Sequence, residues 1–153
     1  MERASNQMDG NKGTISEMFD AVNSITQSPT SHDSLKALGN AVALMMASPR
    51  HKYLFLADIE SMILPPILLG QAKLYSTDKG PVAFAIWANL SADVEQRWLY
   101  EGARLSPADW NSGDRLWLVE IISPMGHGEV AMEDLRQTVF AGLTFQVGPG
   151  VIR

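Results

Sequence analysis

The sequence predicts an α+β fold, an α/β sandwich in which helices pack on a central mixed or antiparallel sheet. Three observations predict it. Residues 33–48 space their apolar side chains three to four apart, as an amphipathic helix does. Residues 72–88 are typical of two strands joined by a turn, and residues 116–122 are a nearly continuous apolar run. With 153 residues, 46% of them hydrophobic, one core can be buried.

The chain is predicted to be a flexible tail over residues 1–13 followed by a single domain over 14–153. The tail has few large apolar groups, so burial cannot offset the entropy lost on ordering it. A weak helix is predicted to follow, ending at the turn-rich Ser28-Pro29-Thr30-Ser31. Its apolar residues are Met18, Val22 and Ile25.

Two helices are predicted next. The first is expected to begin at an N-cap, Asp33 or Ser34, and to end at Ser48, because a residue before proline disfavours the helical region. The second covers residues 53–63, and Pro65-Pro66 is expected to end or kink it.

A β-hairpin is predicted from strands at 72–76 and 81–88. Between them lies Thr77-Asp78-Lys79-Gly80, where glycine can adopt the positive φ that a tight turn needs.

The second half alternates further helices and strands. Ser91 is positioned to cap a helix that runs to Leu99, and a polar loop covers 106–113. Residues 116–122 are typical of a strand buried on both sides. A helix with its apolar residues between Val130 and Phe140 and a final strand within 143–147 complete the prediction.

Composition excludes several classes of function. Seventeen acidic and twelve basic residues give a net charge of −5, and the basic ones are scattered, which argues against nucleic acid as a partner. The absence of cysteine excludes disulfides and thiolate chemistry. The longest apolar run, 63–69, is too short for stable membrane insertion, and residues 1–14 lack the apolar core of a secretory signal. We therefore expect a cytoplasmic protein.

His51 is the strongest candidate for acid–base chemistry among the three histidines. It follows a proline that ends an amphipathic helix, so a sharp corner would fix its ring. The alternative is a histidine that only satisfies a helix end. Ser48 is a candidate nucleophile activated by His51, or else a cap or turn residue.

Asp114 is the predicted partner of that histidine. It directly precedes the buried strand, where a carboxylate could accept a hydrogen bond from an imidazole and hold its tautomer. The alternative is an ordinary turn aspartate paired with Arg115.

No cofactor is predicted. Gly126-His127-Gly128 lacks the lysine and hydroxyl residue of a phosphate-binding loop, and the histidine spacing fits no metal site. The tryptophans are expected to pack in the core or at its rim, although such residues could also line an apolar groove for an acyl chain. They are Trp87, Trp98, Trp110 and Trp117.

Three blocks taken together resemble the toxin-activating lysine acyltransferases of RTX haemolysin systems. They are Ser48-Pro49-Arg50-His51, then Pro81-Val82-Ala83-Phe84 running into Trp87-Ala88-Asn89-Leu90-Ser91, and Asp109-Trp110-Asn111-Ser112-Gly113-Asp114-Arg115-Leu116-Trp117. The resemblance covers about residues 35–126.

This resemblance implies a fold similar to the Gcn5-related acetyltransferases. It also implies transfer of a fatty acyl group from acyl carrier protein to internal lysines of an RTX protoxin in the cytoplasm, which activates the toxin. In the family the catalytic pair corresponds to His51 and Asp114, and Ser48 has been implicated as well. The donor thioester is a substrate, so no cofactor is implied, and a homodimer is left open.

The chain departs from the family pattern in places. Residues 52–55 replace a Trp-Pro pair, and Val119-Glu120-Ile121 stands where members have Asp-Trp. The family continues beyond the position of Arg153 through a basic strand and a helix, so docking of the carrier would depend on few basic residues. Candidates are Arg97, Arg104, Arg115 and Arg136.

Two alternatives follow from these departures and from the chemistry. One is a diverged, non-catalytic member that only binds acyl carrier protein or a partner chain. The other keeps the activity but passes the acyl group through Ser48 or His51 as a covalent intermediate.

Overall fold

A computed structural model describes residues 29–151 of the chain. Contacts divide the chain into two units, residues 1–36 and 37–153, and the sheet belongs to the second. The predicted tail and the predicted helix at 14–28 lie outside the described residues.

A four-stranded mixed sheet, in the order β1-β2-β3-β4, forms the centre of the second unit. Its strands are β1 (Ala72–Thr77), β2 (Gly80–Leu90), β3 (Arg115–Ile122) and β4 (Gln146–Val147). The first three are antiparallel neighbours, and β4 runs parallel to β3. The predicted hairpin is confirmed, with Gly80 at φ +124° closing the turn.

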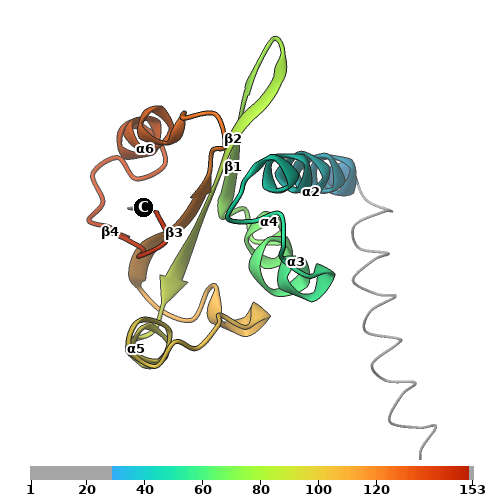
Figure 1. Ribbon diagram of the computed structural model, residues 1–153. Coiled ribbons are helices and arrows are strands. Elements are labelled where there is room, and N and C mark those ends of the chain that lie inside the picture. The colour runs from blue at the N-terminus through green and yellow to red at the C-terminus, as the bar shows by residue number, and fades with distance from the viewer. Residues whose placement is uncertain (1–28, 152–153) are drawn as a thin grey trace, which may run out of the picture. The chain divides into compact units, whose positions relative to one another are not determined.

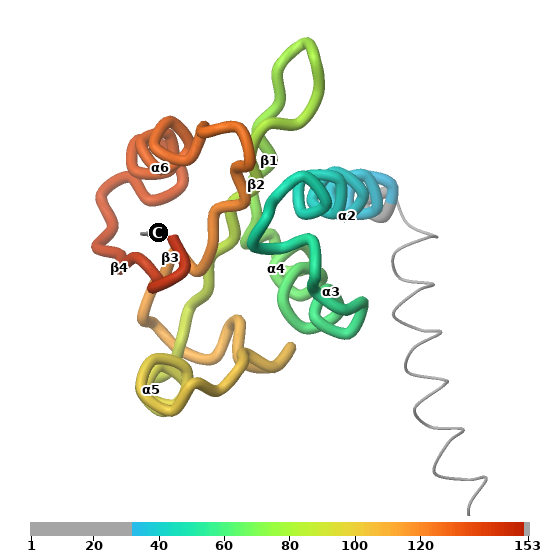
Figure 2. Tube along the Cα trace, viewed as in Figure 1, coloured from blue at the N-terminus to red at the C-terminus, as the bar shows by residue number. Residues whose placement is uncertain are grey.

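Helices cover both faces of this sheet. They are α2 (Pro29–Ala47), α3 (Leu56–Met62), α4 (Leu64–Leu68), α5 (Ala92–Tyr100) and α6 (Gly128–Gln137), with a 3₁₀ turn, η1 (Pro107–Asp109). Figures 1 and 2 show α3 and α4 on one side of the sheet and α6 on the other. Of the helices within residues 29–151, none is long and apolar enough to span a membrane.

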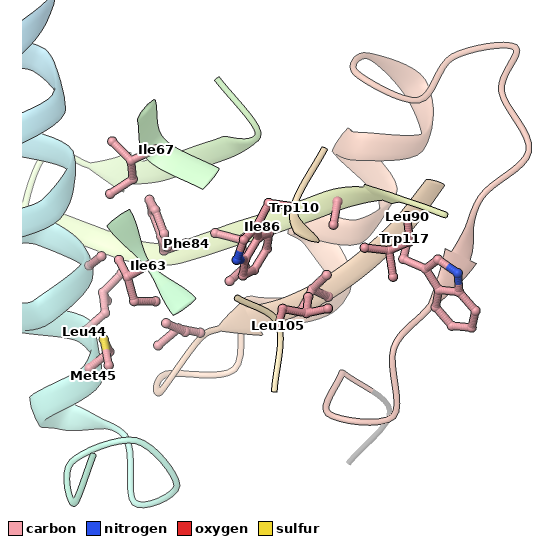
Figure 3. Close-up of a cluster of buried hydrophobic side chains, with 14 of the residues drawn as sticks. Leu44, Met45, Ile63, Ile67, Phe84, Ile86, Leu90, Leu105, Trp110 and Trp117 are labelled. Carbon is pink, nitrogen blue, oxygen red and sulfur yellow. The ribbon is translucent and has the colours of Figure 1, made fainter. Parts of the chain in front are cut away.

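Each face of the sheet buries its own apolar core. One core joins α2, α3 and α4 to side chains of β2 and β3 that alternate along the strands, and Figure 3 shows Leu44, Ile63, Phe84 and Ile86 within it. The other joins the opposite side of β2 and β3 to α6, with Leu135 fully buried. The continuous apolar run in β3 is therefore explained by burial on both faces, as predicted.

Three predicted boundaries are wrong, one of them because proline is tolerated in the first turn of a helix. Helix α2 begins at Pro29, so Asp33 and Ser34 lie inside it. Helix α3 ends at Met62, just ahead of Pro65-Pro66 as predicted, but it begins at Leu56 and not at residue 53; the two prolines lie in the first turn of α4. The last helix ends at Gln137, so Phe140 packs in the core from beyond its end.

A β-bulge in β3 determines which face Glu120 occupies. In the pairing of β2 with β3, Ile86 lies opposite Glu120 but Trp87 lies opposite Leu118, so Val119 is an extra residue. Residues directly opposite each other share a face of the sheet, and Ile86 belongs to the α3–α4 core. Strict alternation from Leu118 would have placed Glu120 on the α6 face. The bulge therefore turns Glu120 toward the helix side that carries α3 and α4.

A hydrogen-bonded cluster ties the edge strand β1 to α6. Lys73 Nζ and Tyr75 Oη each donate to Asp134 Oδ2 at 2.6 Å. The hydrogen bond from Lys73, followed by that from Tyr75, lowers the pKa of Asp134 below its usual range. Burial and the same aspartate raise the pKa of Tyr75.

This cluster makes a prediction about acid stability. Because the folded state lowers the pKa of Asp134, the stabilisation is complete above the unfolded value, near 4, and is lost as the pH falls further. Asp134→Asn should lower the melting temperature at pH 7 and flatten its dependence on pH below 4. Thermal melts of both proteins from pH 2.5 to 7 measure this, and an unchanged acid slope in the variant would contradict it.

Candidate active site

The corner after α2 holds His51 and Ser48 against each other. Helix α2 ends at Ala47, and the backbone turns so that the N–H groups of His51 and Lys52 both donate to the carbonyl of Ser48. Within this turn Ser48 Oγ lies 2.7 Å from His51 Nδ1. Both residues are buried: 7% of Ser48 and 6% of His51 is exposed to solvent. The corner therefore fixes the imidazole ring, as the sequence predicted.

Glu120 lies on the other side of the imidazole. Its Oε2 is 3.6 Å from His51 Nε2, an ion-pair contact that is too long for a hydrogen bond. Arg50 Nη2 donates to the same oxygen at 2.9 Å, and the backbone N–H of Ile121 donates to Oε1 at 3.1 Å. A buried carboxylate is costly unless it is paired, and these groups pair it.

The three side chains form a continuous polar chain from Ser48 through His51 to Glu120. Ser48 Oγ can accept the proton of Nδ1, which leaves the lone pair of Nε2 free on the side of Glu120. When the ring takes up a second proton, Glu120 stabilises the imidazolium that forms. The arrangement can therefore take a proton from a substrate and hold it.

Asp114 is not the partner of His51, so the predicted contact is wrong. Asp114 is exposed and directly precedes β3, of which Glu120 is the sixth residue. At about 3.3 Å per residue, six positions along the strand separate their backbones by roughly 20 Å. Arg115 pairs with Glu95 rather than with Asp114. The assignment of Asp114 as a catalytic residue stays a prediction without geometric support.

Sequence reasoning from periodicity missed Glu120 and Arg50. A signal was present, because Glu120 is the only charged residue in a strand segment, 116–122, that was expected to be buried on both sides. A carboxylate in such a strand needs a partner. The partner itself could not be read from the sequence, since Arg50 lies 70 positions away.

An apolar cavity of about 320 Å³ adjoins Glu120. Helices α3 and α5, the segment from Arg104 to Trp110, the bulge in β3 and the chain after β4 all contribute to its wall. The lining residues are Leu54, Asp58, Ser61, Met62, Trp98, Arg104, Leu105, Trp110, Val119, Glu120, Pro149 and Gly150. Arg104 forms an ion pair with the buried Asp58 in this wall. Of the four basic candidates from the sequence, only Arg104 is thus at the cavity.

The chain after β4 closes over the carboxylate because it is glycine-rich. A Cβ at Gly150 would lie 2.8 Å from Glu120 Oε2 and 3.4 Å from Arg50 Nη2. A Cβ at Gly148 would lie 2.9 Å from the carbonyl oxygen of Val119, the bulge residue. Glycine at both positions lets this segment lie directly on the bulge and on the ion pair.

The remaining candidates have structural places. His127 is the N-cap residue of α6, and Trp87, Trp110 and Trp117 are buried, which confirms their packing role. Trp98 stacks edge-on against Trp117 at 5.3 Å between ring centroids. Within residues 29–151 no three histidine, aspartate or glutamate side chains are grouped closely enough to hold a metal ion.

Comparison with known proteins identifies the kind of protein that carries this site. The model of the RTX toxin acyltransferase family matches residues 30–148. The leukotoxin-activating lysine-acyltransferase LtxC of Aggregatibacter actinomycetemcomitans is 36% identical over 107 residues, which cover 70% of this chain and 64% of that protein. The lysine-acyltransferase RtxC of Vibrio cholerae is 36% identical over 104 residues, 67% of this chain and 68% of RtxC.

A protein-lysine myristoyltransferase, HlyC of Escherichia coli, is 34% identical over 103 residues, which cover 67% of this chain and 61% of HlyC. The chain thus spans about two thirds of the length of the curated relatives it matches. The family match includes the corner at His51, the bulged strand and the start of the glycine-rich segment. On this evidence the chain belongs to the RTX toxin acyltransferase family.

Proposed function

We propose that this protein transfers a fatty acyl group from a carrier-bound thioester to a lysine side chain of an RTX protoxin. The observation that carries the proposal is the buried His51–Glu120 pair beside an apolar cavity. The acid–base pair could deprotonate the lysine amine, and the apolar cavity could bind the acyl chain. The names of the relatives, which are lysine-acyltransferases and toxin activators, agree with this chemistry.

The reaction needs a base because a lysine amine is protonated at neutral pH and cannot attack while protonated. In the proposed mechanism the His51–Glu120 pair takes one proton from the ammonium group. The amine nitrogen then bonds to the thioester carbonyl carbon, and the carbon–sulfur bond breaks. The second proton of the attacking nitrogen passes to the departing thiolate, so the products are an amide and a thiol.

Each polar residue of the site has a distinct part in this proposal. Glu120 lines the cavity and would stabilise the charge that develops on His51. Ser48 would fix the ring through Nδ1, and Arg50 would hold the carboxylate in place. Asp114 has no part in it. In this proposal transfer is direct, because Ser48 is buried and does not line the cavity.

The same proposal covers the acyl donor, the cellular location of the reaction and the fold family. Acyl carrier protein is the donor that the resemblance implies, and its use would place the reaction in the cytoplasm. A Gcn5-related fold is supported by the mixed sheet, by the bulge in β3 and by the parallel pairing of β3 with β4.

The test is transfer itself. The protein is incubated with an RTX protoxin and with acyl carrier protein charged with a fatty acid, and the protoxin is analysed by mass spectrometry. The expected result is the mass of one acyl chain on a lysine, with no adduct on the enzyme when only donor is present. Donor binding without transfer would favour a non-catalytic binding module. A stable acyl-enzyme would contradict direct transfer and favour a covalent intermediate on Ser48 or His51.

Gly150→Ala offers a prediction about how the site is assembled. The new Cβ would lie 2.8 Å from Glu120 Oε2, and the flexible end of the carboxylate is what must move. We expect a roughly tenfold or greater loss of the transfer rate, since a displacement of about 1 Å can cost a hundredfold. Parallel assays and thermal melts of the variant measure this.

Gly39→Ala is the matched control. Gly39 lies in α2, and an added Cβ meets nothing within 4 Å. This variant should keep full activity and gain up to about 1 kcal/mol in stability. Equal activity of the two variants would contradict the positioning role of the segment at Gly150.

A further inference from the structure

A second cavity adjoins the ion pair between Arg50 and Glu120. We propose that this second cavity admits the side chain of the acceptor lysine, whose ammonium group replaces the Arg50 guanidinium at Glu120 Oε2. The inference rests on the proposed function, because it names where the second substrate enters the same site. It adds a binding site, and it makes Arg50 the partner of the carboxylate only until the acceptor binds.

The ion pair has one member in the lining of each cavity, and the two cavities lie on different faces of the sheet. Glu120 and Gly150 line the first cavity. Arg50 lines the second, together with Ile121 and Val151, the residues that follow those two in the chain. Successive side chains of a strand point to opposite faces, and Ile121 belongs to the core on the α6 face. A donor in the first cavity and an acceptor in the second would therefore not compete for the same space.

The lining of the second cavity suits a lysine side chain. It combines apolar side chains, which are Ile121, Met132 and Val151, with a polar group made up of Arg50, Ser123, Gly126, Gly128 and Glu129. The apolar side chains can cover the flexible hydrocarbon stem of a lysine, while its charged end lies among polar groups. This mixed lining fits an amphipathic side chain better than a wholly apolar one.

The charges of this lining favour a cation over an anion. Among the described residues that line the second cavity, Arg50 is the only basic one, and its guanidinium is already paired with Glu120. Glu129 is exposed and lies in the first turn of α6, so its negative charge opposes an anionic ligand at the amino end of this helix. An ammonium group would instead be attracted to the cavity.

The position of Arg50 allows an acceptor to replace it. Its Nη2 donates to Glu120 Oε2 at 2.9 Å, and the same oxygen lies 3.6 Å from His51 Nε2. The side chain of Arg50 is 44% exposed and that of Glu120 is 8% exposed, so the arginine can move into solvent while the carboxylate stays buried. An ammonium group bonded to Oε2 keeps the carboxylate paired. It is also held by the oxygen that contacts the imidazole, which takes its proton in the proposed mechanism.

The test measures binding of a lysine-like amine without any acyl donor. The probe is dansylcadaverine, a fluorophore that carries an aminopentyl chain, and its reference compound has a hydroxyl group in place of the amine. The full chain should bind the amine about twofold to tenfold more tightly than the alcohol, because displacing Arg50 offsets part of the gain. Arg50→Met should raise this preference to about tenfold or more, and Glu120→Gln should abolish it.

Two variants, each of which narrows one cavity, show which cavity the amine enters. Gly128→Leu places a side chain in the second cavity, where an added Cβ meets only Ser123 Cβ, at 4.0 Å. It should weaken amine binding about tenfold, the value of two buried methylene groups. Ser61→Leu narrows the first cavity and should change amine binding by less than about twofold.

Gly39→Leu is the matched control for the glycine substitution. Gly39 is an exposed residue of α2, and an added Cβ there meets nothing within 4 Å. Amine binding by this variant should equal that of the wild type. Circular dichroism checks that all variants fold. In transfer assays, Gly128→Leu should raise the KM of the acceptor and leave the KM of the donor unchanged, and Gly39→Leu should change neither.

The outcomes separate this inference from the proposed function. Equal binding of the amine and the alcohol would overturn the inference, and so would amine binding that is lost in Ser61→Leu but kept in Gly128→Leu. Displacement of the probe by phosphopantetheine without an acyl group would also overturn it, since the second cavity would then hold the arm of the donor. A preference for the amine that responds to Gly128→Leu and Arg50→Met supports the site even if no acyl group is transferred, and in that case only the catalytic proposal fails.

Discussion

Glu120→Gln should lower the rate of acyl transfer by about 100-fold to 1000-fold, which is the usual contribution of an acid–base group. The substitution keeps the size and shape of the side chain and removes its charge. An amide cannot stabilise an imidazolium, and it leaves Arg50, which donates to Glu120 Oε2 at 2.9 Å, without its anionic partner. Rates with charged carrier protein and a protoxin acceptor measure the effect.

The matched control for this prediction is Asp114→Asn, the same chemical change at the carboxylate that the sequence favoured. Asp114 is exposed and precedes β3, so the rate should stay within about twofold of the wild type. A large loss in Asp114→Asn with full activity in Glu120→Gln would reverse the assignment and restore the pair that the family resemblance implied.

His51→Gln should have the second large effect, a loss of transfer by about 100-fold to 10,000-fold. Glutamine is similar in reach but has no group that takes up a proton near neutral pH. The buried Ser48 hydroxyl would also lose its 2.7 Å partner, which should cost about 1–3 kcal/mol of stability. Rate measurements and urea unfolding of the same preparation test both parts.

His32→Gln is the control, because His32 is an exposed residue of α2. It should change neither the rate nor the unfolding midpoint. A His51→Gln protein that is less stable but fully active would show that the histidine only satisfies the end of α2, which was the alternative interpretation of its position.

Much of the fold could be predicted because its signals are local. The hairpin of β1 and β2 depends on alternation and on one glycine turn. Helix α5 begins directly after Ser91, whose Oγ accepts from the backbone N–H of Val94 as an N-cap should. The start of α2 was misplaced because proline both ends helices and starts them.

The candidate site likewise has one part that the sequence predicts and one part that it does not. Ser48 and His51 are three positions apart at a helix end, so their contact follows from local geometry. The contact with Glu120 depends on the bulge at Val119, which changes the face of every residue after it. Alternation along the sequence contains no sign of that extra residue. Asp114 was therefore chosen for its position in a turn, whereas the carboxylate beside His51 lies inside the strand.

The parallel pairing of β4 with β3 also could not be predicted from the sequence. The strand has only two residues, Gln146 and Val147. Its pairing with β3 positions the glycine-rich segment that follows it against the bulge. A pattern of two residues predicts nothing by itself. Glycine is required at positions 148 and 150 because the backbone there lies directly against Val119 and Glu120.

A double-mutant cycle on His51 and Glu120 is the most direct measurement of whether they act as one unit in the transfer of the acyl group. Transfer rates are compared for the wild type, His51→Gln, Glu120→Gln and the double variant. Side chains that act as a unit are strongly non-additive, so the double variant should be about as slow as the slower single variant. Two effects that multiply would contradict the account, because they would mean that the imidazole and the carboxylate work independently.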